Sequence, residues 1–91
     1  MSYALFDPGR VVATPSALRA FDVDFRTDCL MRHLKGDWGD LCEEDKEANQ
    51  QALRDGSRIL SAYIHPTTKE KLYVITEADR SSTCLLLPDD Y

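Results

Sequence analysis

Residues 58–64, Arg-Ile-Leu-Ser-Ala-Tyr-Ile, and residues 71–76, Lys-Leu-Tyr-Val-Ile-Thr, decide the fold of this 91-residue chain. Both stretches are rich in β-branched and aromatic residues, which favour strands. The connection between them is short enough for a hairpin. Residues 82–87, Ser-Thr-Cys-Leu-Leu-Leu, return as a third strand that Pro88 ends. The last third of the sequence therefore predicts an antiparallel meander.

Helical patterns precede this meander. Thr14-Pro15 predicts a helix start, because Thr supplies a capping oxygen and Pro is tolerated at the first helical position. A second helix is expected over about residues 25–35, with Gly36 in a C-terminal capping role. The run Asp40-Leu41-Cys42-Glu43 has the form of a capping box, so a third helix is expected to begin there and to end at Gly56.

Together these elements predict an α+β fold: one two-layer domain over residues 1–91, with N-terminal helices packed on a C-terminal antiparallel sheet of three to four strands. Residues 10–13, Arg-Val-Val-Ala, are a short additional strand candidate. Residues 1–9 are expected to be loosely ordered, with a turn at Asp7-Pro8-Gly9. No repeat or low-complexity linker indicates a domain boundary.

The composition narrows the classes of function. A net charge of −5 argues against a protein that binds the nucleic-acid backbone, which would need a basic face, and is compatible with a basic protein partner. No apolar run is long enough to cross a bilayer, and the first residues lack a signal-peptide pattern, so a cytoplasmic location is expected. Cys29, Cys42 and Cys84 have neither the even number of a disulfide framework nor zinc-site spacing. We expect reduced thiols that are mostly buried or half-buried.

Residues 33–41, His-Leu-Lys-Gly-Asp-Trp-Gly-Asp-Leu, contain the only Trp of the chain. The two glycines predict a shaped turn, because Gly adopts backbone angles that other residues avoid. Trp38 is the strongest single binding candidate if it is exposed, because aromatic anchors dominate interface energies. The alternative is that Trp38 folds back as the lid of a small core. The turn matches no nucleotide, metal or nucleophile motif.

Six carboxylates against one lysine occupy the block from Asp37 to Glu47. A solvated helix face is the ordinary interpretation of such a block. The more specific hypothesis is an acidic surface that imitates nucleic acid or contacts a partner rich in Arg and Lys.

His33, Asp37 and Asp40 can in principle bind a divalent metal, since imidazole and carboxylates suit several ions. The alternative places His33 on the packed side of its helix and uses the two aspartates in the loop and the next helix cap.

Glu77, Asp79 and Arg80 form a second polar cluster, which could carry out acid–base chemistry if burial separated the two carboxyl pKa values. The alternative is an exposed turn with a weak ion pair. An enzyme built from both clusters would require the two polar turns to meet in one pocket.

Four segments together resemble a family of small bacterial proteins carried on plasmids and integrated mobile elements, which are called "plasmid-related" or hypothetical proteins. These segments are Arg32-His33-x-x-Gly36-Asp37-Trp38-Gly39-Asp40-Leu41, Glu44-Asp45-x-x-x-Asn49, Arg58-Ile59-Leu60-Ser61-Ala62-Tyr63 and Ile75-Thr76-Glu77-Ala78-Asp79-Arg80-Ser81. The resemblance covers about residues 10–88. It implies a mobile-element setting, and it assigns no activity and no catalytic residue.

The sequence thus predicts a small acidic binding protein without catalytic activity, cofactor or metal. A mobile-element setting suits an anti-defence inhibitor of a nuclease or CRISPR effector, and the expected partner is a protein with a basic nucleic-acid-binding groove. The alternative is a small metal-dependent or acid–base enzyme that uses His33 and the loop carboxylates. A homodimer through an exposed strand edge, such as residues 85–87, is a third hypothesis. The expected contact residues are Asp37, Trp38, Asp40, Glu43, Glu44, Glu47, Glu77, Asp79 and Arg80.

Overall fold

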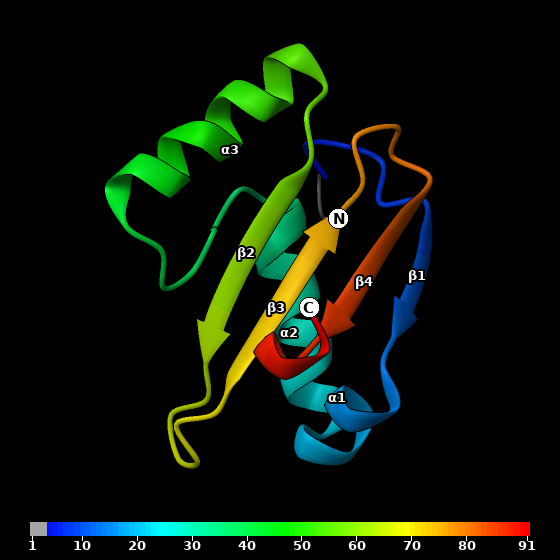
Figure 1. Ribbon diagram of the computed structural model, residues 1–91, viewed down its shortest axis with the longest axis vertical. Coiled ribbons are helices and arrows are strands. Elements are labelled where there is room, and N and C mark those ends of the chain that lie inside the picture. Colours follow the sequence, from blue (N-terminus) through cyan, green and yellow to red (C-terminus); the bar gives the residue numbers. More distant parts are fainter. Residues whose placement is uncertain (1–3) are drawn as a thin grey trace.

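The computed structural model describes residues 4–91 and confirms the α+β prediction (Figure 1). Its elements, in chain order, are β1 (Arg10–Ala13), α1 (Pro15–Ala20), α2 (Val23–Leu34), α3 (Glu43–Asp55), β2 (Ile59–Ile64), β3 (Lys71–Thr76), β4 (Ser82–Leu86) and the short 3-10 helix η1 (Pro88–Asp90). The three strands of the predicted meander and the strand candidate at residues 10–13 are all present.

The four strands form one sheet in the order β1-β4-β3-β2. β2 pairs with β3 and β3 with β4 in antiparallel fashion, as predicted, whereas β1 lies parallel to β4. The expectation of a wholly antiparallel sheet is therefore wrong for β1, which reaches β4 through the helices and not through a tight turn. Because β4 has a partner on each side, residues 85–87 are not a free edge. The edges of the sheet are β1 and β2.

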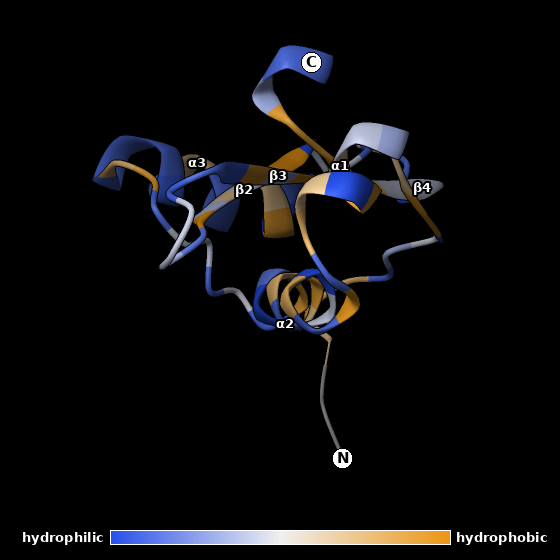
Figure 2. Cartoon of the chain, turned by 90° about the horizontal axis from the view of Figure 1, so that it is seen from below, coloured by the Kyte–Doolittle hydropathy of each residue, from blue (hydrophilic) through white to orange (hydrophobic). Residues whose placement is uncertain are grey.

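The two faces of the sheet have different surroundings. α2 covers one face, and the C-terminal end with η1 lies on the other (Figure 2). His33 of α2 bonds to Ser61 of β2, so Ser61 and its alternate neighbours face α2. We call the opposite side the outer face, which by alternation and register carries Leu60, Ala62, Ile64, Tyr73, Ile75, Cys84 and Leu86. The helices before the meander were expected to cover one face of the sheet together. α3 instead lies beside β2, so it does not take part in covering that face as α2 does.

Two apolar clusters hold the layers together. The larger one joins α1 and α2 to the sheet and consists of Ala17, Phe21, Cys29, Tyr63, Leu72, Val74 and Leu85. The smaller one lies between α3 and β2 and is built on Trp38, Ala52 and Ile59. Of the three cysteines, Cys29 is buried and Cys84 half-buried, as expected for most of the thiols, while Cys42 is exposed.

The helix ends follow local capping chemistry with one exception. The Thr14 side chain accepts the Ala17 N–H as predicted, and Asp22 caps α2 in the same way, which starts that helix at Val23. Gly56 ends α3 in the left-handed conformation, also as predicted. The capping box expected at residues 40–43 is wrong, because Cys42 is the N-cap and no side chain caps the helix.

The segment before β1 contacts the rest of the fold where it is described. Residues 1–3 of the stretch expected to be loosely ordered lie outside the described residues. The Leu5 N–H donates to the Leu34 carbonyl at 2.8 Å, and the Phe6 ring meets the His33 ring edge-on with centroids 5.3 Å apart. Over residues 4–91, none of the helices combines the length and the apolar character that crossing a membrane requires.

Candidate functional site

The loop that contains Trp38 closes part of the free edge of β2. The Ala62 N–H donates to the Trp38 carbonyl at 3.2 Å, and the Asp40 N–H donates to the Ala62 carbonyl at 2.6 Å. The Asp40 carboxylate then accepts the Ile64 N–H at 3.0 Å. This use of the Asp40 side chain explains why it does not cap α3. The Asp40 side chain and the backbone of residues 38–40 therefore serve the sheet edge.

Asn49 of α3 closes the rest of that edge. Its side-chain amide donates to the Leu60 carbonyl at 2.7 Å and accepts the Leu60 N–H at 3.2 Å, as a neighbouring strand would. Asn49 is buried, and its role could not be read from the sequence, because the neighbouring Gln50 and Gln51 carry the same amide group. Covered edges resist pairing with other chains, so β2 is sealed.

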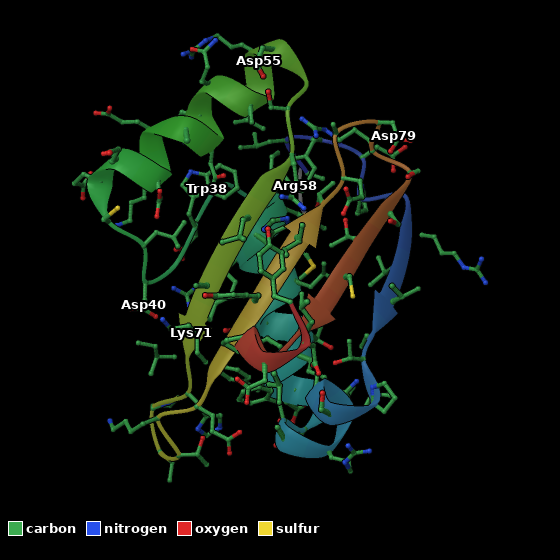
Figure 3. The ribbon with its side chains drawn as sticks, viewed as in Figure 1. Trp38, Asp40, Asp55, Arg58, Lys71 and Asp79 are labelled. Carbon is green, nitrogen blue, oxygen red and sulfur yellow. The ribbon has the colours of Figure 1, made fainter. Side chains whose placement is uncertain are left out.

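Trp38 is 3% exposed and packs against Ala52 and Ile59, so the exposed aromatic anchor is wrong and the core-lid alternative holds. The correction has a physical reason: a small α+β domain has few large apolar residues to fill the space between α3 and the sheet. The loop places the Trp38 backbone at the sheet edge and its ring beneath α3 (Figure 3).

The burial of Trp38 makes a direct prediction for fluorescence. The native protein is expected to emit at short wavelength, and iodide and acrylamide are expected to quench it weakly, because the indole lies out of contact with solvent. As Trp38 is the only Trp, excitation at a wavelength that the four Tyr do not absorb isolates its emission. The same protein in guanidinium chloride is the control, and it should show red-shifted, easily quenched emission. Red emission from the folded protein would contradict this placement.

Asp37, in the loop after α2, pairs with Arg32 of that helix. The Arg32 guanidinium donates to its carboxylate at 2.8 Å, and this contact holds the pKa of Asp37 below its ordinary range. The Tyr63 hydroxyl donates to the Asp37 carbonyl at 2.7 Å, and the Arg32 guanidinium lies 4.7 Å from the centre of the Tyr63 ring. The ion pair is about half exposed and contributes little to stability by itself. Asp37 thus acts mainly in local structure.

His33 is fully buried at the centre of a hydrogen-bonded chain that crosses the sheet. Its Nδ1 contacts the Ser61 hydroxyl at 2.6 Å, and its Nε2 contacts the Thr76 hydroxyl at 2.9 Å. Thr76 bonds to Thr83 at 2.7 Å, and Thr83 donates to the Pro8 carbonyl at 2.8 Å.

The end of this chain fixes the direction of every bond in it. Because Thr83 donates to a carbonyl, it accepts from Thr76; Thr76 therefore accepts from Nε2–H of His33, and Nδ1 accepts from Ser61. Burial, and secondarily the Arg80 charge, lowers the pKa of His33 to about 4. Both ring nitrogens are occupied, which leaves His33 no lone pair for a metal.

Arg80 clamps the second polar cluster to α3. Its guanidinium donates to the carbonyls of Ser57 at 2.7 Å and Ala52 at 3.0 Å, at the C-terminal end of the helix. Arg80 reaches them from a left-handed backbone angle of 59°. Positive charge beside the carbonyl end of a helix is favourable, so Arg80 has a structural use. Glu77 and Asp79 stay exposed in the turn.

The structure does not bring the enzyme candidates together. Asp40 and Asp79 lie at opposite ends of the sheet (Figure 3). Among residues 4–91, no three His, Cys, Asp or Glu side chains are placed to hold a metal ion.

The acidic side chains of α3 remain free for contact. Glu43, Glu44, Asp45 and Glu47, which we call the acidic flank, are all exposed. Within the described residues, their one ion pair joins Glu43 to Lys46 at 3.8 Å. Three of these four residues belong to the predicted contact set.

The acidic flank borders the outer face of the sheet, which only the short helix η1 and the C-terminal end cover in part (Figure 1). Ile64 is 43% exposed, and Leu60 and Tyr73 are half-buried. A hollow of about 250 Å³ separates α3 from this face and is lined by Asp45, Ala48, Asn49, Arg58 and Leu60. The C-terminal Tyr91, 65% exposed, stands over Tyr73 and accepts a hydrogen bond from Arg58 at 3.0 Å. The sequence did not show which face of the sheet is exposed, because the strands carry apolar residues on both faces and lack a polar alternation.

No protein-family model matches the chain, and neither the curated protein sequences nor the solved structures contain a match.

Proposed function

We propose that this chain is a non-enzymatic protein-binding module of a mobile genetic element, and that it binds through the outer face and the acidic flank. The observation that carries this proposal is a sheet face that only η1 and the C-terminal end cover in part, beside an exposed acidic helix. Three of the candidates for chemistry have structural uses: His33 bonds to Ser61, Asp40 accepts the Ile64 N–H, and Arg80 donates to the end of α3.

The surface has the composition of a protein interface. Leu60, Ile64 and Tyr73 supply partly exposed apolar area at its centre, and Tyr91 adds an aromatic side chain with a polar end. The acidic flank supplies a charged rim. Apolar centres with polar rims are typical of interfaces, and rim charges set association rate and partner choice. A basic partner surface complements this rim.

The partner that we propose is a protein with a basic nucleic-acid-binding groove, such as a host nuclease or CRISPR effector. The acidic flank would then occupy positions that phosphates otherwise take, and the chain would act as an anti-defence inhibitor. The mobile-element resemblance and the net charge of −5 support this identification. Nucleic acid added to the complex should displace the chain from such a partner.

The triple variant Glu43→Lys, Glu44→Lys, Glu47→Lys is expected to weaken partner binding by about tenfold to a hundredfold at low salt. Three exposed charge pairs contribute roughly 0.2–1 kcal/mol each, and reversal replaces attraction with repulsion. Wild-type affinity should fall as salt rises, since exposed charges are screened. The immobilised wild-type chain first captures the partner from host extract, and surface plasmon resonance then compares the purified proteins.

A matched control separates the position of the charges from their number. Asp24→Lys, Asp28→Lys, Glu70→Lys changes the net charge equally at exposed carboxylates outside the acidic flank. Equal weakening by both triple variants would overturn the proposed surface. For the apolar part, Ile64→Arg should abolish binding while Val23→Arg, at a 61% exposed position on α2, should not.

A further inference from the structure

We propose that β1 is a second docking site, where an extended segment of a partner protein adds to the sheet as a fifth strand. The segment would place one large apolar side chain in a hollow beneath β1 and a carboxylate against Arg26. This site lies at the opposite edge of the sheet from β2. It binds an acidic segment, whereas the acidic flank binds a basic surface, so the site goes beyond the proposed function.

The outer edge of β1 has backbone groups available for pairing. The Arg10 N–H donates to the Ser81 carbonyl and the Thr14 N–H to the Leu85 carbonyl, both at 3.0 Å. In a parallel ladder alternate residues bond to the neighbouring strand, so Val11 and Ala13 direct their N–H and C=O groups away from β4. Within residues 4–91, no other segment pairs with that side.

The contrast with the other edge is informative. β2 is closed by the Asn49 side chain and by the Trp38 loop, whereas β1 exposes Val11 at 45% and Val12 at 42%. Proteins usually protect an edge strand with charge, proline, a bulge or a covering segment. The four residues of β1 limit the pairing to a short segment. Such an edge suits recognition of one strand.

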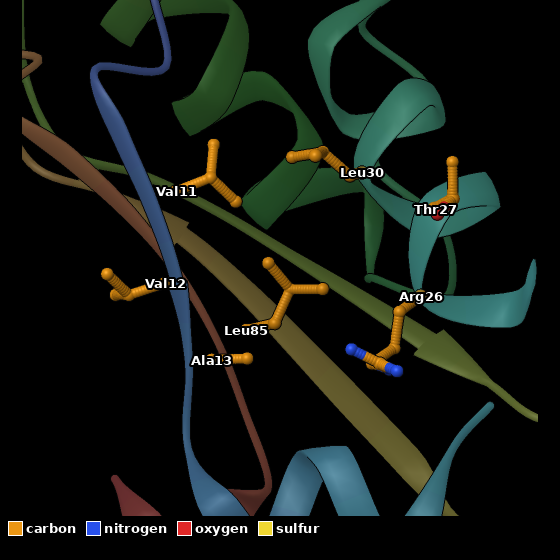
Figure 4. Close-up of a pocket in the computed structure, with 7 residues that line it drawn as sticks. All are labelled: Val11, Val12, Ala13, Arg26, Thr27, Leu30 and Leu85. Atoms are coloured by element: carbon orange, nitrogen blue, oxygen red, sulfur yellow. The ribbon is translucent and has the colours of Figure 1, made fainter. Parts of the chain in front are cut away.

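A hollow of about 220 Å³ lies between β1 and α2, next to this edge (Figure 4). Val11, Ala13, Leu30 and Leu85 give it apolar walls. Sites for drug-sized ligands measure about 300–1,000 Å³, so this one is suited to a single side chain. Side chains of an added strand alternate between the two faces, and one that points toward α2 would enter the hollow.

Arg26 indicates the charge of the segment. Its Nε donates to the Phe21 carbonyl at 3.1 Å, which holds the guanidinium at the wall of the hollow. Among the residues that the structure describes, Arg26 and Arg10 form no ion pair within 4 Å. A carboxylate two residues from the inserted apolar side chain lies on the same face of the added strand and can reach Arg26.

The probe is a fluorescein-labelled, capped peptide Ser-Val-Thr-Leu-Thr-Glu-Ser, in which Leu fills the hollow and Glu meets Arg26. We expect saturable binding by fluorescence anisotropy and the largest NMR shifts at the Val11 and Ala13 amides. Arg26→Glu should weaken binding at least tenfold, and a peptide with Lys in place of Glu should recover it on that variant. Shifts confined to the outer face, or no binding at millimolar peptide, would overturn the proposal.

Two further measurements identify the occupant. Val11→Pro removes one outward N–H without touching the β4 ladder and should abolish peptide binding, while Val12→Thr should retain it. A dimer of the wild-type chain in light scattering that Val11→Pro dissociates would assign the edge to a second copy and overturn the proposal. The Glu43, Glu44, Glu47 triple variant should bind the peptide normally, so failure of this site and failure of the proposed function remain distinguishable.

Discussion

The Gly39→Ala substitution is expected to lower the free energy of unfolding by about 3–5 kcal/mol. Gly39 has a φ of +79°, which disfavours any L side chain. A Cβ there would lie 2.1 Å from the Ala62 carbonyl oxygen and 2.6 Å from Cδ1 of the buried Tyr63 ring. Neither neighbour can retreat freely, because Ala62 belongs to β2 and Tyr63 to the main core.

The substitution also breaks contacts around it. If the loop moves away from β2, the hydrogen bonds from Asp40 N–H to Ala62 and from Ala62 N–H to Trp38 are lost. Each such bond contributes about 0.5–1.5 kcal/mol, and displacement of the Trp38 ring opens the smaller core. Trp38 emission in native buffer should consequently move to longer wavelength.

Gly56→Ala is the matched control for Gly39→Ala. Gly56 has nearly the same φ, +80°, and a Cβ there would meet nothing within 4 Å. Its expected cost is only the left-handed backbone term, about 1–2 kcal/mol. Urea unfolding followed by circular dichroism measures both variants. Equal losses would show that the backbone angle alone matters and that the close approach of the loop to β2 does not.

Elements that depend on neighbouring residues could be predicted from the sequence. The Thr14 cap, the Gly56 helix end and the β2–β3 hairpin each depend on a few adjacent residues whose chemistry acts locally. The exposure of the acidic flank could also be predicted from the sequence, because an acidic block at the start of a helix is exposed in most arrangements. These signals survive folding because the bonds that distant residues make to the same groups, Asp90 to Thr14 and Arg80 to Ala52, leave the local bonds in place.

Elements that depend on distant residues could not be predicted. The parallel pairing of β1 with β4 joins residues about seventy positions apart, and no local pattern encodes its direction. The Asp40 carboxylate could cap the start of α3 or bond to a distant backbone group. It accepts the N–H of Ile64, 24 residues away, and does not cap α3. Trp38 could be an anchor or a core residue on local grounds, and only the position of α3 decides.

The candidate surface illustrates the same limit. Its acidic flank follows from composition, whereas its apolar part depends on which side of the sheet α2 covers. That choice is linked to His33, whose two ring bonds fix Ser61 and Thr76 toward α2. The chemistry of His33 therefore bears on the binding surface through the fold and not through catalysis.

Lowering the pH from 7 to 4 is expected to remove about 3 kcal/mol of stability through His33 alone. Its pKa is about 4 in the folded protein against 6.5 for the free side chain. Between these values the unfolded chain binds a proton that the folded chain does not, so stability is fully present above pH 6.5 and is lost progressively toward pH 4. Urea unfolding at several pH values, followed by Trp38 fluorescence, measures the loss.

His33→Gln supplies the control for this acid effect, because carboxylates that are stabilised in the fold, such as Asp37, also contribute as pH falls. The variant removes the imidazole titration, so the difference between the two stability–pH curves isolates His33. We expect the variant to be less stable at pH 7, where it disturbs the Ser61 and Thr76 bonds, and to lose less between pH 6.5 and 4. Parallel curves would contradict the assignment. Protonation turns Nδ1 into a donor, which forces the Ser61 hydroxyl to reverse and leaves a buried charge. Burial of the ring and the fixed direction of its two hydrogen bonds thus both oppose protonation of His33.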